Sequence, residues 1–328
     1  MDNVSVTSLL ILLGLNCTVE QKVTLFSLTL LCYLIIWILN IALIVTIIVD
    51  KSLHEPMYIF LCNLCINGLY GTSGFYPKFL MDLLSPSHVI SYAGCLLQSF
   101  VIYSSVGCDL SILAVMAYDR YVAICRPLVY HSVMTKQRVS LLVFFSWFLP
   151  HYCMFMNTVT ISQSKLCGSH IHKLYCSNWL IGKIACSVTT ANSAVVYFNI
   201  AFYASHSFFI AWSYMYLIRM CLKPQTNRSK FMQTCAPHLL SLFTYSFAVI
   251  LDLMYMRFGP RDVSQSLQNF MAIQFLIFPP ILNPLIYGLK LTKIRNRILA
   301  ISYNISFLNV IITWNVFHNA FLTGLIYN

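Results

Sequence analysis

Asp119, Arg120 and Tyr121 stand next to each other at the end of a long apolar stretch, and their side chains are suited to reversible ion pairing. An Arg or Asp at the centre of a membrane helix costs about 2.5–3.5 kcal/mol on insertion scales. The cost falls at the membrane edge, so we expect this pair to mark the point where a helix leaves the bilayer. Arg120 can pair with Asp119 in one state and face a cavity in another, which is the chemistry of a switch.

The composition indicates a membrane protein with several spans. Of the 328 residues, 59% are hydrophobic and only 9% are charged, whereas soluble domains carry roughly 25% charged residues. The formal net charge is +11, but the basic residues form no dense run of the kind that binds nucleic acid. They fall in the short joints between apolar stretches, as topology determinants do. We therefore expect membrane lipids as partners, and no nucleic acid.

Seven stretches of the chain have the length of about 20 mainly apolar residues that a membrane helix needs. They cover approximately 24–49, 57–84, 92–125, 139–161, 192–222, 231–256 and 266–290. With the N-terminus outside, most of the 20 Lys and Arg residues fall on the cytoplasmic side, as the positive-inside rule requires. The sequence therefore predicts an all-α fold, a seven-transmembrane helix bundle with an extracellular N-terminus.

Two glycosylation sequons agree with this topology. Asn3 and Asn16 each begin an Asn-x-Ser/Thr sequence ahead of the first span, so both would be lumenal during synthesis. We expect both to carry a glycan in the extracellular segment 1–23. A third match, at Asn227, would face the cytosol and is expected to be a chance occurrence.

Blocks of sequence along the chain resemble the olfactory receptors, a branch of the rhodopsin-like (class A) G-protein-coupled receptors. The blocks are LHEPMYIFLCNL at 53–64, MAYDRYVAICRPLVYH at 116–131, KFMQTCAPHL at 230–239 and PPILNPLIYGLK at 279–290. The likeness covers about 20–299, and NGLYGTSGFYPKFLMDLL is more similar to fish odorant receptors. The resemblance implies a plasma-membrane receptor for small organic odorants. It also implies an olfactory-type stimulatory heterotrimeric G protein as partner, a rise in cyclic AMP, and a role in the sense of smell.

Other classes of protein fit less well. No nucleophile, base and third group share one motif, so we expect no enzyme and no cofactor. A seven-helix receptor for a peptide or lipid is an alternative, although such receptors rarely end their third helix with MAYDRYVAIC. A transporter is a second alternative, but it predicts internal repeats with paired midplane polar breaks, and the sequence has none that we detect.

Four cysteines belong to the predicted outer face. Cys95 opens the third span, and Cys167, Cys176 and Cys186 lie in the loop between the fourth and fifth spans. Extracellular thiols oxidise, and four cysteines allow three connectivities. The resemblance selects the pairs Cys95–Cys176 and Cys167–Cys186. No Cys-x-x-Cys pair is joined by a second one, so we expect no zinc site.

The resemblance implies a switch at the inner end of the bundle. Arg120 would leave its partner for a cavity that opens between the third and sixth spans, and Tyr214 and Tyr287 would meet near that cavity. Pro284 removes a backbone donor and would let the seventh helix bend, and Asn283 would cap or bridge the disturbed turn. The alternative is that both tyrosines are ordinary interface aromatics.

Two ionisable residues inside the spans are open to more than one interpretation. Related receptors bind sodium with an acid on the second helix, at the position of Gly68 here, and Asn67 is expected to point to another face. Asp109 and Asn283 could instead form a weak sodium or proton site, or Asp109 could be a purely structural, hydrogen-bonded carboxyl. His238 is either a buried neutral histidine or part of a helix-packing switch.

The predicted ligand pocket has apolar and aromatic walls, which suit small organic ligands. Helical periodicity counted from Arg120 turns four residues of the third span towards the bundle: Tyr103, Val106, Gly107 and Leu110. The resemblance adds residues from the later spans: Phe198, Phe202, Val249, Ile250, Leu253 and Ile273. Ser246 stands where most relatives have a Tyr, so one family contact is expected to be lost.

The predicted inner surface offers an apolar contact for the G protein. In the resembling receptors, the residue after the proline of the second inner loop enters a hydrophobic slot on the G protein. Pro127 and Leu128 match that pair. The alternative role of Leu128 is to anchor the loop in the inner leaflet.

The C-terminal part departs from the family pattern. After a receptor domain at 24–290, residues 291–299 are typical of a short basic amphipathic helix on the inner leaflet. The segment 300–328 contains no Lys, Arg, Asp or Glu. We expect an atypical apolar tail, and the sequence indicates no role for it.

Overall fold

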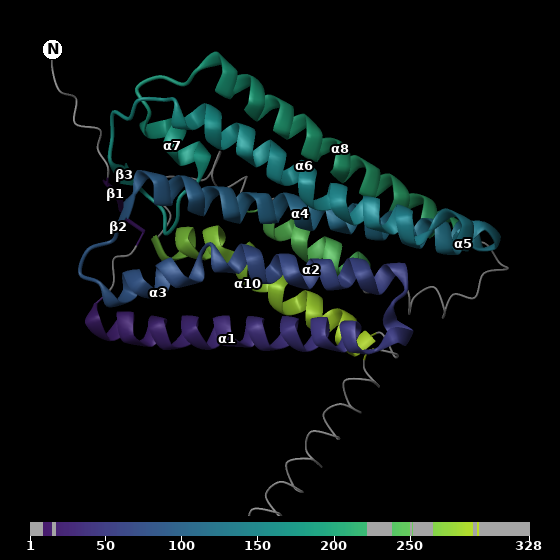
Figure 1. Cartoon of the computed structure of the whole chain (residues 1–328). Coiled ribbons are helices and arrows are strands. Elements are labelled where there is room, and N and C mark those ends of the chain that lie inside the picture. Colours follow the sequence, from purple (N-terminus) through teal and green to yellow (C-terminus); the bar gives the residue numbers. More distant parts are fainter. Residues whose placement is uncertain are drawn as a thin grey trace, which may run out of the picture.

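The structure is a computed structural model that describes residues 9–14, 18–221, 238–249, 251, 265–290 and 294 (Figure 1). Within these ranges the chain forms the helical segments of a seven-helix bundle. In chain order they are α1 (Val19–Val49), α2 (Pro56–Ser73) with α3 (Tyr76–Leu84), α4 (Tyr92–Cys125), α6 (Lys136–Ser162), α8 (Thr190–Cys221), the helix His238–Val249 and α10 (Gln265–Lys290). The single-turn helices η1 (Lys51–Leu53), η2 (Pro127–Val129) and α5 (Tyr130–Val133) join them at the inner end.

Five of these helices are long and apolar enough to cross a membrane on their own, namely α1, α4, α6, α8 and α10. The described part of the sixth segment is the apolar helix His238–Val249. The predicted glycosylation sites Asn3 and Asn16, the amphipathic segment 291–299 (apart from residue 294) and the tail 300–328 lie outside the described residues.

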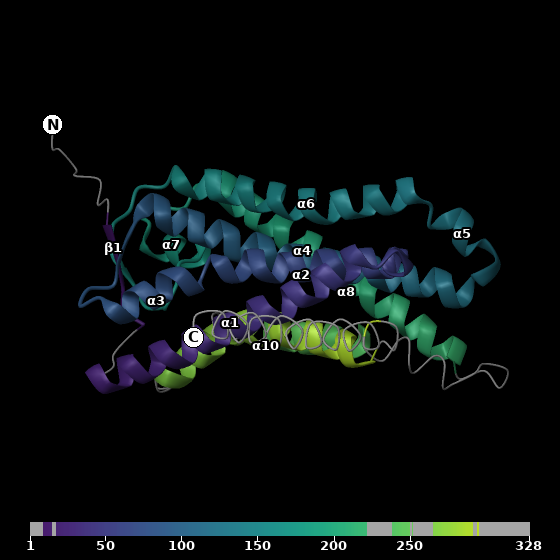
Figure 2. The same ribbon diagram turned by 60° about the horizontal axis from the view of Figure 1, so that its bottom comes forward.

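α4 is the central helix of the bundle. It packs against α2, α6 and α8, and Figure 1 shows it between α2 and α6. The most apolar window of α4 is 67% buried, against 28% for α1 and for α6. The view in Figure 2 shows α1 beside α10, which pack against each other on another side of the bundle. Side chains placed along α4 can therefore reach most of the other helices.

The first helix begins earlier than predicted, at Val19 instead of residue 24. Thr18 and Gln21 form a capping box. The backbone N–H of Gln21 donates to Thr18 Oγ1 over 3.4 Å, and the backbone N–H of Thr18 donates to Gln21 Oε1 over 3.0 Å. This cap allows a polar first turn to continue the helix beyond the apolar stretch from which the prediction was made.

The second span is two helices, not the single helix predicted over 57–84. α2 ends at Ser73 and α3 begins at Tyr76. Pro77 has no N–H to donate to the carbonyl of Ser73, which a continuous helix would require. The break also lies where α4 comes close, since a Cβ added to Gly74 would lie 2.8 Å from Val101 Cγ1.

Two prolines of α10, Pro280 and Pro284, each leave a carbonyl group that another helix satisfies. Pro284 cannot donate to the carbonyl of Pro280, and Asn40 Nδ2 of α1 donates to that oxygen over 2.8 Å. Pro280 cannot donate to the carbonyl of Leu276, and the Tyr76 hydroxyl of α3 donates to it over 3.4 Å. A polar residue on a neighbouring helix thus replaces each of these two lost bonds, as the bilayer core requires.

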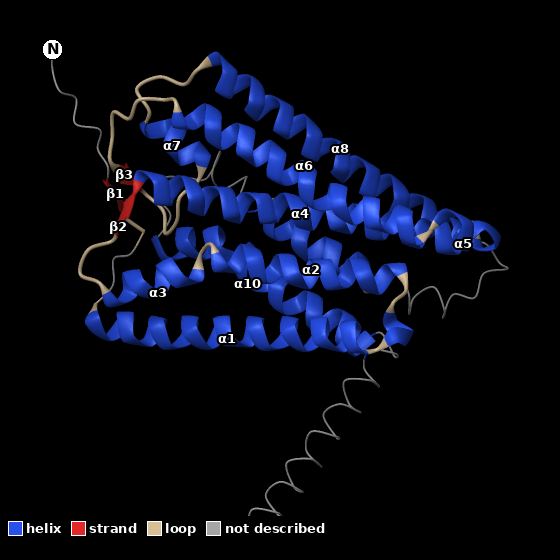
Figure 3. Ribbon diagram, in the orientation of Figure 1, coloured by secondary structure: helices blue, strands red, loops and turns tan. Residues whose placement is uncertain are grey.

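A small sheet closes the outer end of the bundle, and it was not predicted (Figure 3). β1 (Leu9–Leu12) is its central strand, antiparallel to β2 (Val89–Ser91) and parallel to β3 (His170–Ile171). Leu10 and Leu12 of β1 are buried and pack in one apolar cluster with Cys95 and Cys176. The segment before the first span is therefore bound to the loops between the helices.

Candidate functional site

Both outer disulfides implied by the resemblance are present. Cys95 at the start of α4 is bonded to Cys176, and Cys167 is bonded to Cys186, with Cα–Cα distances of 5.3 and 4.9 Å. The first bond joins the long outer loop to α4, and the second closes a loop of its own before α8. Such crosslinks stabilise a loop mainly by restricting its unfolded states.

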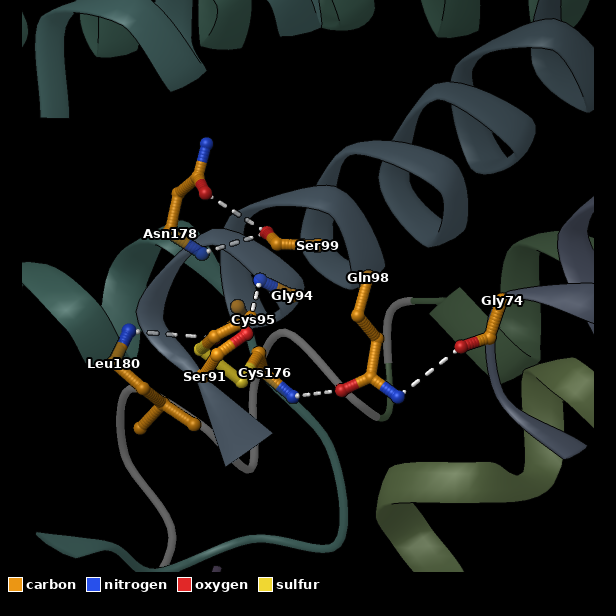
Figure 4. Close-up of a disulfide and its surroundings, with 10 residues drawn as sticks. Gly74, Ser91, Gly94, Cys95, Gln98, Ser99, Cys176, Asn178 and Leu180 are labelled. Carbon is orange, nitrogen blue, oxygen red and sulfur yellow. Dashed lines mark hydrogen bonds between the residues drawn. A yellow bond between two sulfur atoms is a disulfide. The ribbon is translucent and has the colours of Figure 1, made fainter. Parts of the chain in front are cut away.

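Hydrogen bonds around Cys176 continue this attachment (Figure 4). The Cys176 N–H donates to Gln98 Oε1 over 3.0 Å, and Gln98 Nε2 donates to the Gly74 carbonyl over 3.1 Å. Ser99 Oγ accepts from the Asn178 N–H over 2.9 Å and donates to Asn178 Oδ1 over 2.9 Å. The outer loop is therefore fixed to α4, and its short helix α7 (Asn178–Ile184) lies beside the top of the bundle.

A cavity of about 770 Å³ lies below this loop. Its walls come from α4, α6, α7, α8, the helix His238–Val249 and α10. Five of the predicted pocket residues line it: Tyr103, Val106, Gly107, Leu110 and Val249. Two others, Ile250 and Leu253, lie outside the described residues. The volume and the apolar walls suit a small organic molecule.

Three predicted pocket residues do not line the cavity. Phe198 is 61% exposed, and its ring stacks on that of Phe202 with centroids 6.3 Å apart. Ile273 packs instead against an apolar cluster that includes Phe75, Phe79 and Tyr175. The cavity face of α8 carries Val196, Asn199, Ile200 and Tyr203. The prediction chose neighbouring positions, and one residue turns a helix by about 100°.

Gly107 contributes space to the cavity wall. A Cβ at this position would lie 2.5 Å from the Tyr203 hydroxyl and 2.8 Å from Pro150 Cβ. Both distances are too short for real atoms, so any side chain would push α6 or Tyr203 away from α4. Gly107 thus allows the Tyr203 hydroxyl to lie against the α4 backbone.

Tyr245 is a cavity residue that the sequence analysis missed. Its side chain is buried, its hydroxyl donates to the Val106 carbonyl, and both Tyr245 and Ser246 line the cavity. The Tyr expected at position 246 is therefore absent, but a tyrosine ring is present in the wall one residue earlier. The signal that could have found it is a lone Tyr in an apolar helix, whose hydroxyl needs a partner when buried.

Asp109 has a partner that was predicted to point elsewhere. Asn67 Nδ2 donates to Asp109 Oδ1 over 2.7 Å and to the Ser105 carbonyl over 2.8 Å, so Asn67 faces α4. Asn283 Oδ1 accepts from the Ser241 hydroxyl. Asp109 and Asn283 thus have separate partners, and a shared cation or proton site stays a prediction. Within the described ranges, no group of three His, Cys, Asp or Glu side chains could bind a metal ion.

Asp119 and Arg120 form an ion pair at the inner end of α4. Arg120 Nε donates to Asp119 Oδ2 over 2.9 Å, and Arg120 Nη2 contacts the same oxygen. The hydroxyl of Tyr130, in α5, donates to Asp119 Oδ1 over 2.8 Å. Burial and the adjacent Asp119 carboxylate raise the pKa of the Tyr130 hydroxyl, which therefore keeps its proton. Tyr121 packs its ring against that of Tyr216, with centroids 5.4 Å apart.

Tyr287 has a partner on the sixth segment that the sequence did not identify. Its hydroxyl lies 3.0 Å from Nδ1 of His238, and both residues are fully buried. The predicted partner Tyr214 belongs to α8, but its side chain lies outside the described residues. Asn283 bridges to Ser241 on the sixth segment, instead of capping its own helix. Two hydrogen bonds thus join the inner half of α10 to the helix His238–Val249.

Pro127 and Leu128 lie in η2, directly after α4. The Leu128 side chain is 100% exposed, and the Val129 N–H donates to the Arg126 carbonyl over 3.2 Å, which holds the turn. An apolar side chain is thus presented at the inner end, a few residues from the ion pair.

These features define a seven-helix membrane receptor: a helical bundle, an outer loop bonded to the third helix, a cavity below that loop, and an ion pair at the opposite end. Residues 29–304 match the family model described as olfactory receptor. The chain is 35% identical over 294 residues to Olfactory receptor 1D2 of Gorilla gorilla gorilla and of Homo sapiens, covering 88% of this chain and 92% of each relative. It is 34% identical over 295 residues to Olfactory receptor 1D5 of Pan troglodytes, covering 88% and 93%.

The chain belongs to the olfactory receptor family. It is a multi-pass plasma-membrane receptor of the G-protein-coupled class, and not an enzyme. These three relatives are primate proteins, so the expected likeness to fish odorant receptors stays a prediction.

Proposed function

We propose that this receptor binds small organic odorants in the cavity and activates an olfactory-type stimulatory G protein, which raises cyclic AMP in the sense of smell. The cavity has mostly apolar walls and lies directly below the outer loop. Apolar ligands gain free energy by leaving water for such walls, at roughly 25 cal/mol per Å² buried. The ion pair and the exposed leucine lie at the other end of the same central helix, so a ligand at one end and a G protein at the other would both contact α4.

The arrangement at the inner end supports an inactive state. Arg120 is bonded to Asp119, and Tyr130 bonds the second oxygen of the same carboxylate. We propose that activation releases Arg120 towards the sixth segment, with Tyr214, Tyr287, Asn283 and Pro284 as the other parts of the switch. The bonds of Tyr287 and Asn283 to the helix His238–Val249 would then break or change.

The fully exposed Leu128 is the observation that carries the G-protein part of the proposal. Burying a Leu side chain is worth roughly 1.5–3 kcal/mol. The turn N–H of Val129 holds this loop in place, so little ordering is left to be done on binding. We propose that Pro127 sets the turn and that Leu128 enters an apolar slot on the G protein. The alternative is that Leu128 anchors the loop in the inner leaflet.

Leu128→Ala separates the two roles. With a G-protein contact, maximal cyclic-AMP production should fall about ten-fold at matched surface density, since 1.4 kcal/mol is one decade of equilibrium constant. Odorant affinity measured without G protein should stay unchanged, because the cavity lies at the other end of the bundle. The measurement is a dose–response curve in cells that contain the olfactory-type G protein.

Val129→Ala is the matched control, because Val129 is the next apolar residue of the same turn and is 42% exposed. It should leave the maximum within about two-fold. Equal and small losses in both variants would favour the lipid anchor. An unchanged maximum in Leu128→Ala would reject the contact.

A further inference from the structure

Two buried polar atoms on the cavity face of α8 have no hydrogen-bond partner within the described part of the chain. They are Oδ1 of Asn199 and the hydroxyl oxygen of Tyr203. Both atoms are buried, Asn199 as a whole is 6% exposed, and both residues line the cavity. They are four residues apart on α8 and therefore lie on the same face, one turn from each other.

Several other polar groups of the cavity are hydrogen-bonded to protein, among them Asn178 and Asn192. Asn192 Nδ2, nearer the outer end of α8, donates to Thr160 Oγ1 over 3.1 Å and to Asn157 Oδ1 over 3.4 Å. A buried polar group without a partner is costly and uncommon in native proteins. The unpaired atoms of Asn199 and Tyr203 are therefore available to bond a polar group of a ligand.

The geometry fixes what each atom can accept or donate. Asn199 Nδ2 donates to the Cys153 carbonyl over 3.4 Å, so Oδ1 is the end of the amide that is left without a partner. Oδ1 is an acceptor only, so its partner must bring a proton, whereas the Tyr203 hydroxyl can donate or accept. Gly107 leaves the room in which the Tyr203 hydroxyl lies.

The charge of the cavity sets a further limit. Among the described residues that line it there is no Asp or Glu, and Lys183 is the charged one, on the short helix α7 with its Nζ 5.4 Å from the centroid of the Trp179 ring. A protonated amine would therefore lose its hydration without gaining a counter-ion. The remaining walls are mainly apolar, which suits an uncharged molecule.

We infer that the cavity selects neutral odorants with a single hydroxyl on an apolar skeleton, namely alcohols and phenols. The ligand hydroxyl donates to Asn199 Oδ1 and accepts from the Tyr203 hydroxyl. Ketones, aldehydes, esters and ethers of the same shape lack the proton and leave Oδ1 unpaired. This inference rests on the proposed function, because it takes the cavity as the odorant site.

Probes of matched shape test the inference. One set is 1-octanol, octanal and 1-methoxyheptane, and the other is menthol, menthone and menthyl methyl ether. Binding is measured as the rise in Tm of the purified full-length receptor, and signalling as cyclic AMP in cells. At least one of the two alcohols should bind about ten-fold more tightly than its carbonyl and ether analogues, since leaving a buried acceptor unpaired costs on the order of one decade of affinity.

Asn199→Leu should remove this discrimination. The affinity for the alcohol should fall about ten-fold, to that of the ether, while the ether keeps its affinity. Tyr203→Phe should also lower the affinity for the alcohol. It serves as the second variant if Asn199→Leu does not reach the cell surface. Phe198→Leu is the matched control, because Phe198 is the preceding residue of α8 and lies outside the cavity wall. It should leave all six probes unchanged.

Equal binding of alcohols and ethers to the wild type would overturn the inference, and so would no binding of either alcohol. Discrimination that survives in both Asn199→Leu and Tyr203→Phe would also overturn it. Failure of the proposed function gives a different result. In that case the alcohol raises the Tm of the wild type, Asn199→Leu abolishes the rise, and cyclic AMP stays flat in both.

Discussion

The Asp119 carboxylate at the inner end of α4 has two hydrogen-bond partners. It is fully buried, and both of its oxygens accept hydrogen bonds, one from Arg120 and one from Tyr130. A buried charge is tolerated only when its partners compensate for the lost hydration. The state described here is therefore held by the loop hydroxyl as well as by the arginine.

Tyr130→Phe tests this role of the loop hydroxyl. The variant removes one bond to the carboxylate and should favour the state in which Arg120 is released, because a hydrogen bond to a charged group is worth about 1.5–3 kcal/mol. We expect cyclic AMP without ligand to rise at least about three-fold at equal surface density. Ser132→Ala, which removes a hydroxyl from the same short helix, should leave the basal level unchanged. A basal level in Tyr130→Phe equal to that of wild type would contradict the assignment.

The sequence predicted the positions and partners of charged side chains better than those of apolar side chains. The Asp119–Arg120 pair follows from the cost of charge in a membrane, and it is present. Phe198 was misplaced because an apolar side chain is as stable against lipid as in a cavity, so hydrophobicity does not tell the two faces of α8 apart. Asn67 was misplaced because a polar side chain turns to whichever partner the neighbouring helix offers, and that partner was Asp109.

The proline-containing helix α10 relies on hydrogen bonds from residues of α1 and α3. Asn40→Leu should leave the Pro280 carbonyl without its donor in the bilayer core. Interhelical hydrogen bonds in membranes are worth about 0.6–2 kcal/mol. We therefore expect the Tm of the purified receptor to fall by a few degrees. Thr46→Val is the control, because Thr46 is also buried on α1 but donates only to its own helix, at the Ala42 carbonyl. An equal Tm loss in both variants would show that the bridge to Pro280 adds nothing.

Element boundaries were predictable where the ends of the apolar stretch coincide with the ends of the helix. The third span was predicted as 92–125, and α4 has those bounds. The start of α1 depends on a hydrogen-bonded cap outside the apolar stretch, so composition could not locate it. The break between α2 and α3 needs the combination of Pro77 with the close approach of α4 to Gly74, and the second of these is a tertiary contact.

The small sheet at the outer end of the molecule lies next to a group that responds to pH, the ring of His88. The carbonyl of His88 accepts from the Leu12 N–H over 2.8 Å, which joins this loop to β1. Burial lowers the pKa of the His88 ring below 6.5, the Lys22 and Lys78 charges lower it further, and Asp82 opposes them. The unfolded chain then binds a proton more readily than the folded one, so stability falls as the pH drops below about 6.5.

We therefore expect the Tm of the purified receptor to decrease when the pH is lowered from 7.5 to 5.5. The Tm of the His88→Gln variant should decrease less over the same range. His170→Gln is a suitable control, since His170 is a histidine of the same outer sheet, in β3, and is exposed. A pH dependence that is identical in wild type and His88→Gln would exclude His88 as its source.

The central strand of the outer sheet is synthesised long before its partners. β1 ends at Leu12, whereas β2 begins at Val89 and β3 at His170. At translation rates of about 5–20 residues per second, β3 follows β1 by roughly 8 to 30 s. During that time β1 presents an unpaired edge to the lumen of the endoplasmic reticulum, and such edges promote aggregation. The strand is therefore covered on both sides only after the loop that follows the fourth span has been translocated, so the outer sheet cannot be completed before that span has been made.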